Sequence, residues 1–141
     1  MWGMPIKMHY NAAAYRPGLL DEPWYDDLIQ EYLDAIARRG YIVEVNTKSY
    51  LELGTFYPNE RYFPVLLEKG IRVQVNSDSH YPERINNGRL QALAVLQASG
   101  YHTVTEMYNN EWKDMPSSFI HDSCDFTISF SIKNLQWLFD R

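Results

Sequence analysis

The chain has 141 residues, of which 45% are hydrophobic and 15% aromatic, and its formal net charge is -5. This composition suits one folded domain and excludes a disordered chain. The acidic balance argues against a protein that coats nucleic acid, because such proteins need a basic surface. Cys124 is the single cysteine, so no internal disulfide can form, and no apolar run is long enough to span a bilayer. We therefore expect a soluble, cytoplasmic protein without membrane contact.

The first predicted element is an amphipathic helix before Gly40. Apolar residues recur there at helical spacing. They are Tyr25, Leu28, Ile29, Tyr32, Leu33 and Ile36. Asp21, Glu22 and Pro23 supply a start for this helix, and Gly40 supplies its stop.

The rest of the chain predicts strands that alternate with helices. Short alternating segments at 41–46, 71–76 and 103–107 predict strands, and the segments at 60–69 and 87–99 predict helices. This order predicts an α/β fold with parallel strands, either an open sheet or part of a barrel. In both architectures the reactive groups collect at the C-terminal ends of the strands.

The end of the chain differs in pattern from the part before it. Residues 114–118 predict a loop, residues 126–132 alternate as an amphipathic edge strand, and a short helix is expected after them. We therefore predict a β/α domain over residues 1–112 and a divergent C-terminal tail over residues 113–141.

Polar side chains gather where the second predicted strand ends. Gln74, Asn76, Asp78 and His80 are all even-numbered, so an extended chain directs them to one side. An aspartate and a histidine two residues apart can supply oxygen and nitrogen ligands to a metal, and zinc, manganese and iron all accept this mixture. The alternative is an ordinary turn capped by the aspartate, which is the commoner use of such a sequence.

The preceding predicted strand ends in Glu44 and Asn46 on its polar face. A carboxylate inside an apolar strand is unfavourable to bury unless it is paired or bound to a metal. Glu44, Asn46 and Asn76 are therefore predicted to line a pocket beside the metal ligands Asp78 and His80. The alternative is that Glu44 and Asn46 lie on an edge strand and face solvent.

Two arginines, Arg84 and Arg89, flank the run Asn86-Asn87-Gly88 ahead of the third predicted helix. The run lacks the glycine-rich pattern of a phosphate cradle, so we interpret it as the loop that leads into the helix. The two arginines either meet a phosphate group or lie on a solvated face.

Four segments share their order with a known family. They are Val43-Glu44-Val45-Asn46-Thr47, Tyr57-Pro58, Gly70-Ile71-Arg72-Val73 and Asn76-Ser77-Asp78-Ser79-His80-Tyr81-Pro82-Glu83. In this order they resemble the C-terminal half of PHP-domain phosphoesterases, and the histidinol-phosphatase branch is the most similar. The resemblance covers about residues 7–112.

The resemblance implies part of a distorted (β/α)7 barrel with two or three divalent metal ions at its C-terminal strand ends. It implies hydrolysis of a small phosphate monoester by a metal-activated hydroxide. Asp78 and His80 match the family's last pair of metal ligands, and Glu44 and Asn46 match positions that line the pocket.

The N-terminal part of the chain departs from the family. The family opens with a His-x-His pair, which this sequence lacks, and its Gly-His-x-Asp segment falls on Gly3-Met4-Pro5-Ile6, so that Met4 and Ile6 stand in place of two ligands. With this incomplete ligand set, the resemblance implies a truncated or divergent phosphatase that is weakly active or inactive as this chain.

Two alternatives stay open at this point. One is a non-catalytic PHP remnant that binds a partner or completes a barrel with another chain. The other is a nucleotide phosphatase or phosphodiesterase of the same family. A half-barrel also leaves open sheet edges, which predicts a homo-oligomer formed through them.

Overall fold

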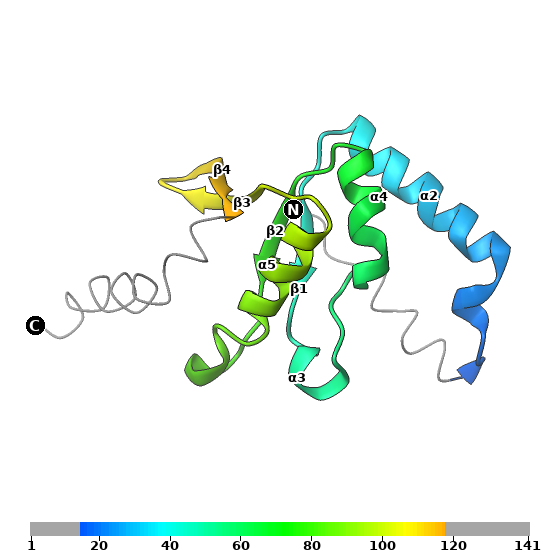
Figure 1. The fold of residues 1–141 in the computed structure, drawn as a ribbon, viewed down its shortest axis with the longest axis horizontal. Helices are drawn as coiled ribbons and strands as arrows, with labels where there is room; N and C mark the ends of the chain where they lie inside the picture. The colour runs from blue at the N-terminus through cyan, green and yellow to red at the C-terminus, as the bar shows by residue number, and fades with distance from the viewer. Residues whose placement is uncertain (1–14, 118–141) are drawn as a thin grey trace, which may run out of the picture.

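The computed structural model describes residues 15–117. Its elements follow in the order α2 (Pro23–Arg38), β1 (Val43–Asn46), α3 (Tyr50–Leu53), α4 (Phe63–Glu68), β2 (Val73–Asn76), α5 (Arg89–Ala98), β3 (Thr103–Tyr108) and β4 (Glu111–Pro116). Single 3-10 turns lie at Leu19–Asp21, Glu60–Tyr62 and Pro82–Arg84. The strands β1 and β2 lie in the middle of the molecule, with α4 and α5 beside them and α2 outside α4 (Figure 1).

The strands β1 and β2 form a parallel pair. Their register joins Val43 to Val73 and Asn46 to Asn76, so both strands end at the same level. This confirms the predicted α/β arrangement with parallel strands. Within residues 15–117 this sheet is open and two-stranded and does not close into a barrel.

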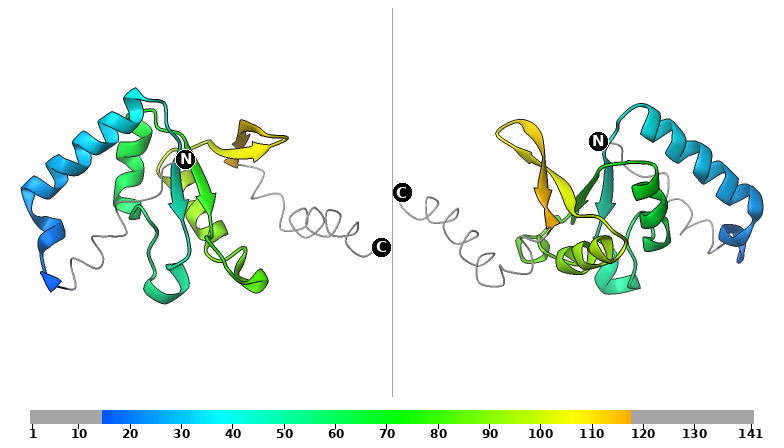
Figure 2. Two further views of the ribbon diagram at one scale, coloured as in Figure 1. Left: turned by 180° about the vertical axis from the view of Figure 1, so that it is seen from behind. Right: turned by 45° about the horizontal axis from the view of Figure 1, so that its top comes forward.

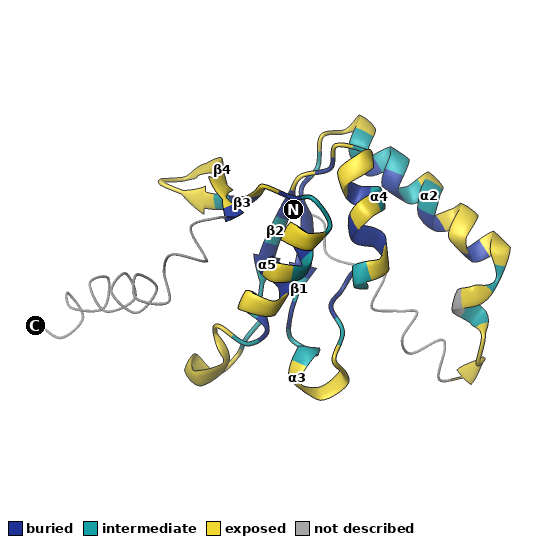
Figure 3. Cartoon of the chain, viewed as in Figure 1, coloured by how far each residue is buried: buried dark blue, intermediate teal, exposed yellow. Residues whose placement is uncertain are grey.

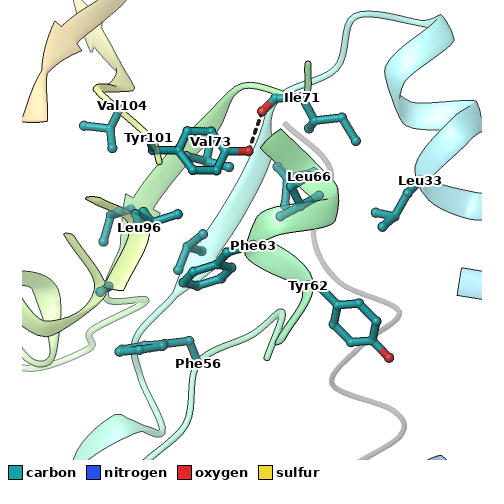
Figure 4. Packing of buried hydrophobic residues seen from close by; sticks show 14 of the residues in the cluster. Leu33, Phe56, Tyr62, Phe63, Leu66, Ile71, Val73, Leu96, Tyr101 and Val104 are labelled. Carbon is teal, nitrogen blue, oxygen red and sulfur yellow. Dashed lines mark hydrogen bonds between the residues drawn. The ribbon is translucent and has the colours of Figure 1, made fainter. Parts of the chain in front are cut away.

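The core lies between the parallel sheet and the helices. Phe63 and Leu66 of α4 and Leu96 of α5 are fully buried against the valines of β1 and β2 (Figure 4). One face of α2 joins this core through Ile29 and Leu33, among others. The placement of Leu28 on that face was wrong, because this residue is 54% exposed and the buried residues of α2 are Tyr25, Ile29, Leu33 and Ile36. Figure 3 shows the buried residues concentrated around β1, β2 and α4.

Three helices end in the same way, at equal spacing in the chain. Gly40, Gly70 and Gly100 follow α2, α4 and α5, and each has a positive φ. In each case the next residue's N–H donates back to a carbonyl of the helix's last turn, the bond that defines a Schellman cap. These bonds are Tyr41 to Ile36, Ile71 to Leu66 and Tyr101 to Leu96. Because residues 41 and 71 complete the caps, β1 and β2 begin at Val43 and Val73, two residues later than predicted.

The sequence predicted that the third strand would join the parallel sheet, and this was wrong. β3 pairs with β4 in an antiparallel hairpin that projects from the rest of the molecule (Figure 2). The turn residues Asn109 and Asn110 have φ values of 50° and 63°, and a turn with two positive φ values matches the twist of a hairpin. The loop predicted at 114–118 was wrong for residues 114–116, which belong to β4. The predicted domain boundary at residue 112 falls inside β4, and the strand and helix predicted after residue 125 lie outside the described residues.

Side chains occupy the outer edge of β2 where a third parallel strand would pair. The Tyr101 hydroxyl donates to the carbonyl of Ile71 at 2.8 Å (Figure 4). Farther along, the Arg89 guanidinium donates to the carbonyl of Val75 at 2.9 Å and to Glu106 of β3 at 2.6 Å. These donors satisfy edge carbonyls that another strand needs, and they help to explain why β3 turns away.

Candidate functional site

The candidate site begins with two asparagines that end β1 and β2. Asn46 and Asn76 are paired in register. The Asn46 Oδ1 atom accepts from the N–H of Lys48 at 3.0 Å, and the Asn76 Oδ1 atom accepts from the N–H of Asp78 at 3.4 Å. Such side-chain bonds to the residue two positions on turn the backbone. Lys48 and Asp78 therefore leave the C-terminal edge of the sheet side by side, at the lower end of the strands in Figure 1.

Lys48 brings Asp78 and His80 to one point. Its Nζ atom lies 3.0 Å from Asp78 Oδ2 and 3.3 Å from His80 Nδ1. An ammonium group only donates, so in this contact His80 Nδ1 is the acceptor. Asp78 has a φ of 46°, in the left-handed region that aspartate tolerates better than most residues. The two side chains predicted as metal ligands thus share one cation, and in this structure that cation is an ammonium group.

We call the group formed by Lys48, Asp78 and His80 the corner. An open pocket of about 160 Å³ lies around it. Its walls include Glu52 of α3, Ser79 and Arg84 of the loop after β2, and the three residues of the corner. The Arg84 guanidinium lies 3.9 Å from a Glu52 carboxylate oxygen. Guanidinium, ammonium and hydroxyl groups are the donors that phosphate oxygens accept from. Arg89, by contrast, is bonded to β2 and β3 and does not line the pocket.

The other predicted pocket residues lie beneath the corner, in the sheet. Glu44 is 8% exposed and accepts from Asn46 Nδ2 at 2.9 Å, so it does not face solvent. Neither Glu44 nor the asparagines Asn46 and Asn76 line the pocket. Glu44 fixes the Asn46 amide, and the same amide holds the backbone of Lys48 through its oxygen. These residues therefore hold the backbone from which the side chains of the corner extend.

The residues at the corner do not make a complete divalent-metal site. A catalytic zinc site ordinarily has three protein ligands. Asp78 and His80 supply two donors of suitable chemistry, but among residues 15–117 no group of three or more His, Cys, Asp or Glu side chains could hold a metal ion. The ammonium of Lys48 lies against both donors.

Lys48 was missed in the sequence, although a signal for it was present. The parity that groups Asn76, Asp78 and His80 also places Lys48 on the face of Glu44 and Asn46, two residues past the end of β1. A lysine was not considered because it is no metal ligand.

Comparisons with known proteins do not assign the chain to a family. No protein-family model matches the chain, and no curated protein matches it either. The resemblance to PHP-domain phosphoesterases therefore stays a prediction from the quoted residues. Within residues 15–117 no helix combines the length and the apolar character needed to cross a bilayer.

Proposed function

We propose that this chain is a metal-dependent phosphate monoester hydrolase of the PHP, histidinol-phosphatase-like type, and that it is weakly active or inactive on its own. One observation carries the proposal: Asp78 and His80 converge on a single cation at the C-terminal edge of two parallel strands. In parallel α/β folds, ligands bind at that edge. With this function we propose that β1, α4, β2 and α5 correspond to part of a PHP-type (β/α) barrel.

A small phosphorylated molecule is the proposed substrate. Arg84 and Ser79 border the pocket beside the corner, and both are suited to phosphate oxygens. The acidic net charge of -5 disfavours a long polynucleotide. Weak activity is expected because the described residues provide two donors for a divalent ion where a catalytic site needs more.

A phosphatase assay tests the proposal. Purified chain is incubated with p-nitrophenyl phosphate or histidinol phosphate, with Mn²⁺, with Zn²⁺ and with a chelator. We expect slow turnover that needs the metal and is lost in the double variant Asp78→Asn/His80→Asn. His102→Asn serves as control, because this histidine is exposed and lies outside the pocket. Robust turnover in the double variant would overturn the assignment of the site.

A second candidate is a non-catalytic PHP remnant that binds a partner or completes a barrel with another chain. The observation that favours it is the Lys48 ammonium between the two ligand-type side chains. The phosphatase assay separates the two candidates, since the remnant is expected to show no metal-dependent turnover that is lost in the Asp78→Asn/His80→Asn variant.

A homo-oligomer formed through a sheet edge belongs to the same proposal. Among the described residues, the outer edge of β1 is paired only by the bridge between Asn46 and Tyr57. Light scattering coupled to size exclusion checks the expected oligomer, and a monomer at high concentration would refute it.

A further inference from the structure

The ammonium group of Lys48 lies against the two side chains that a divalent ion at this corner would use as ligands. Metal bonds to oxygen and nitrogen are about 2.0–2.2 Å long. Nζ is 3.0 Å from Asp78 Oδ2, so an ion bound to that oxygen lies within roughly 5 Å of Nζ in any arrangement. At such separations two cations repel each other, and they also compete for the same lone pairs on Asp78 and His80.

We propose that Lys48 is an internal competitor of the metal, which keeps divalent ions off the Asp78–His80 corner. Removal of its positive charge then turns the corner into a divalent-metal site with higher affinity. The inference rests on the proposed function in one respect, the assignment of Asp78 and His80 as ligand-type side chains. It goes further, because it adds the charge of Lys48 to the incomplete ligand set as a second, removable cause of weak metal binding.

The backbone of Lys48 is held in place, so the ammonium group stays within reach of Asp78 and His80. The backbone N–H of Lys48 donates to Asn46 Oδ1, and the preceding residue, Thr47, is fully buried. The Thr47 N–H donates to the carbonyl of Asn76 at 2.8 Å, and its hydroxyl donates to the carbonyl of Asn87. A cation tethered in this way competes as an intramolecular group, at a high effective concentration.

The ion pair between Lys48 and Asp78 is not what holds the fold together. The two side chains are 39% and 43% exposed, and exposed ion pairs contribute little to stability. A loss of the ammonium group therefore leaves the fold in place. This separates an effect on metal binding from an effect on folding.

The test is a calorimetric titration of the full chain with Mn²⁺. Mn²⁺ is chosen because it prefers oxygen and nitrogen ligands and is less drawn to the thiol of Cys124 than zinc is. We expect Lys48→Met to bind Mn²⁺ about tenfold or more tightly than the wild type, because the repulsion is removed. Lys48→Arg keeps the charge and is expected to bind as weakly as the wild type.

Two further variants assign the gain to the corner and guard against misfolding. The triple variant Lys48→Met/Asp78→Asn/His80→Asn is expected to lose the added affinity. Circular dichroism monitors folding, and Lys48→Gln replaces Lys48→Met if the latter does not fold. Equal affinities of the wild type and the neutral variant would overturn the inference, and so would a gain that survives in the triple variant.

The outcome also separates this inference from the proposed function. A gain in Mn²⁺ affinity in Lys48→Met, with no phosphatase turnover by this metal-loaded variant or by the wild type, supports competition by Lys48 and counts against the proposed hydrolysis. Metal-dependent turnover that is lost in the Asp78→Asn/His80→Asn variant, with no gain in affinity on neutralising Lys48, supports the hydrolysis and counts against the competitor.

Discussion

Replacement of Tyr101 by phenylalanine removes one hydroxyl group from the core. That hydroxyl donates to the carbonyl of Ile71 at 2.8 Å, and the tyrosine side chain is 5% exposed. The ring stays in place, so the change leaves packing intact and deprives a buried carbonyl of its donor. Such a loss is expected to lower the free energy of unfolding by about 1–2 kcal/mol at neutral pH.

The same hydroxyl gives the prediction a pH dependence. Burial raises the pKa of Tyr101 well above its ordinary value of 10.0, so above pH 10 the unfolded chain binds fewer protons than the folded one. Its contribution to stability is complete below pH 10 and is lost as the pH rises toward the raised pKa. At pH 10.5 the loss is about 0.8 kcal/mol, worked from the ordinary pKa. The Tyr101→Phe variant has no such group, so its difference from the wild type narrows by that amount.

Urea unfolding followed by circular dichroism, at pH 7.5 and at pH 10.5, measures both effects. Tyr108→Phe is the matched control, because its ring is 55% exposed and the change there should be a few tenths of a kcal/mol. Burial raises the pKa of Tyr32 as well, but this residue is the same in all three proteins and cancels in their differences. A Tyr101→Phe variant as stable as the wild type at pH 7.5, or a difference that fails to narrow at pH 10.5, would refute the reasoning.

Two further predictions concern positions near the pocket. Gly54 and Gly88 have φ values of 65° and 66°, but an added Cβ meets nothing within 4 Å at Gly54 and lies 2.8 Å from Tyr50 Cβ at Gly88. Gly54→Ala should therefore lower the free energy of unfolding by about 1–2 kcal/mol, through backbone strain alone. Gly88→Ala should lower it by about 1–3 kcal/mol more, and equal urea midpoints for the two variants would contradict the clash. The second prediction concerns Lys48→Met, which should change the free energy of unfolding by less than about 1 kcal/mol. A larger decrease in the free energy of unfolding, measured by thermal melts, would show that the ion pair supports the fold.

Local signals in the sequence were sufficient for α2, α4, α5 and the parallel strands, but not for the short helix α3, which lies in a segment predicted as a connection. Gly40, Gly70 and Gly100 stop three helices, and each stop depends on a few neighbouring residues. The alternation that follows predicts a strand at each place. The common end of β1 and β2 then follows from parallel pairing, which is why Asp78 was placed correctly at the C-terminal edge of the sheet.

Local patterns could not predict the partner of β3, because this strand could pair either with β2 or with the segment that follows it. The pair Asn109-Asn110 is a less familiar hairpin signal than Asn-Gly, yet both residues adopt positive φ. The obstruction of the β2 edge comes from Tyr101 and Arg89, whose roles are visible only in three dimensions. The contact between Lys48 and Asp78 could not be predicted for the same reason, because the two residues lie in different loops that meet only in the folded chain.

The equal spacing of the helix stops divides this part of the chain into three units, which follow Gly40, Gly70 and Gly100. Each of the first two units ends its strand in an asparagine and delivers a charged residue two positions later, Lys48 in one and Asp78 in the other. In the third unit the same positions hold Glu106 and Tyr108, and these lie in β3 of the hairpin. No residue of β3 or β4 lines the pocket, and Glu106 is paired with Arg89. The corner is therefore built by the first two units, and the third unit contributes indirectly, because Tyr101 holds the outer edge of β2 through its hydroxyl.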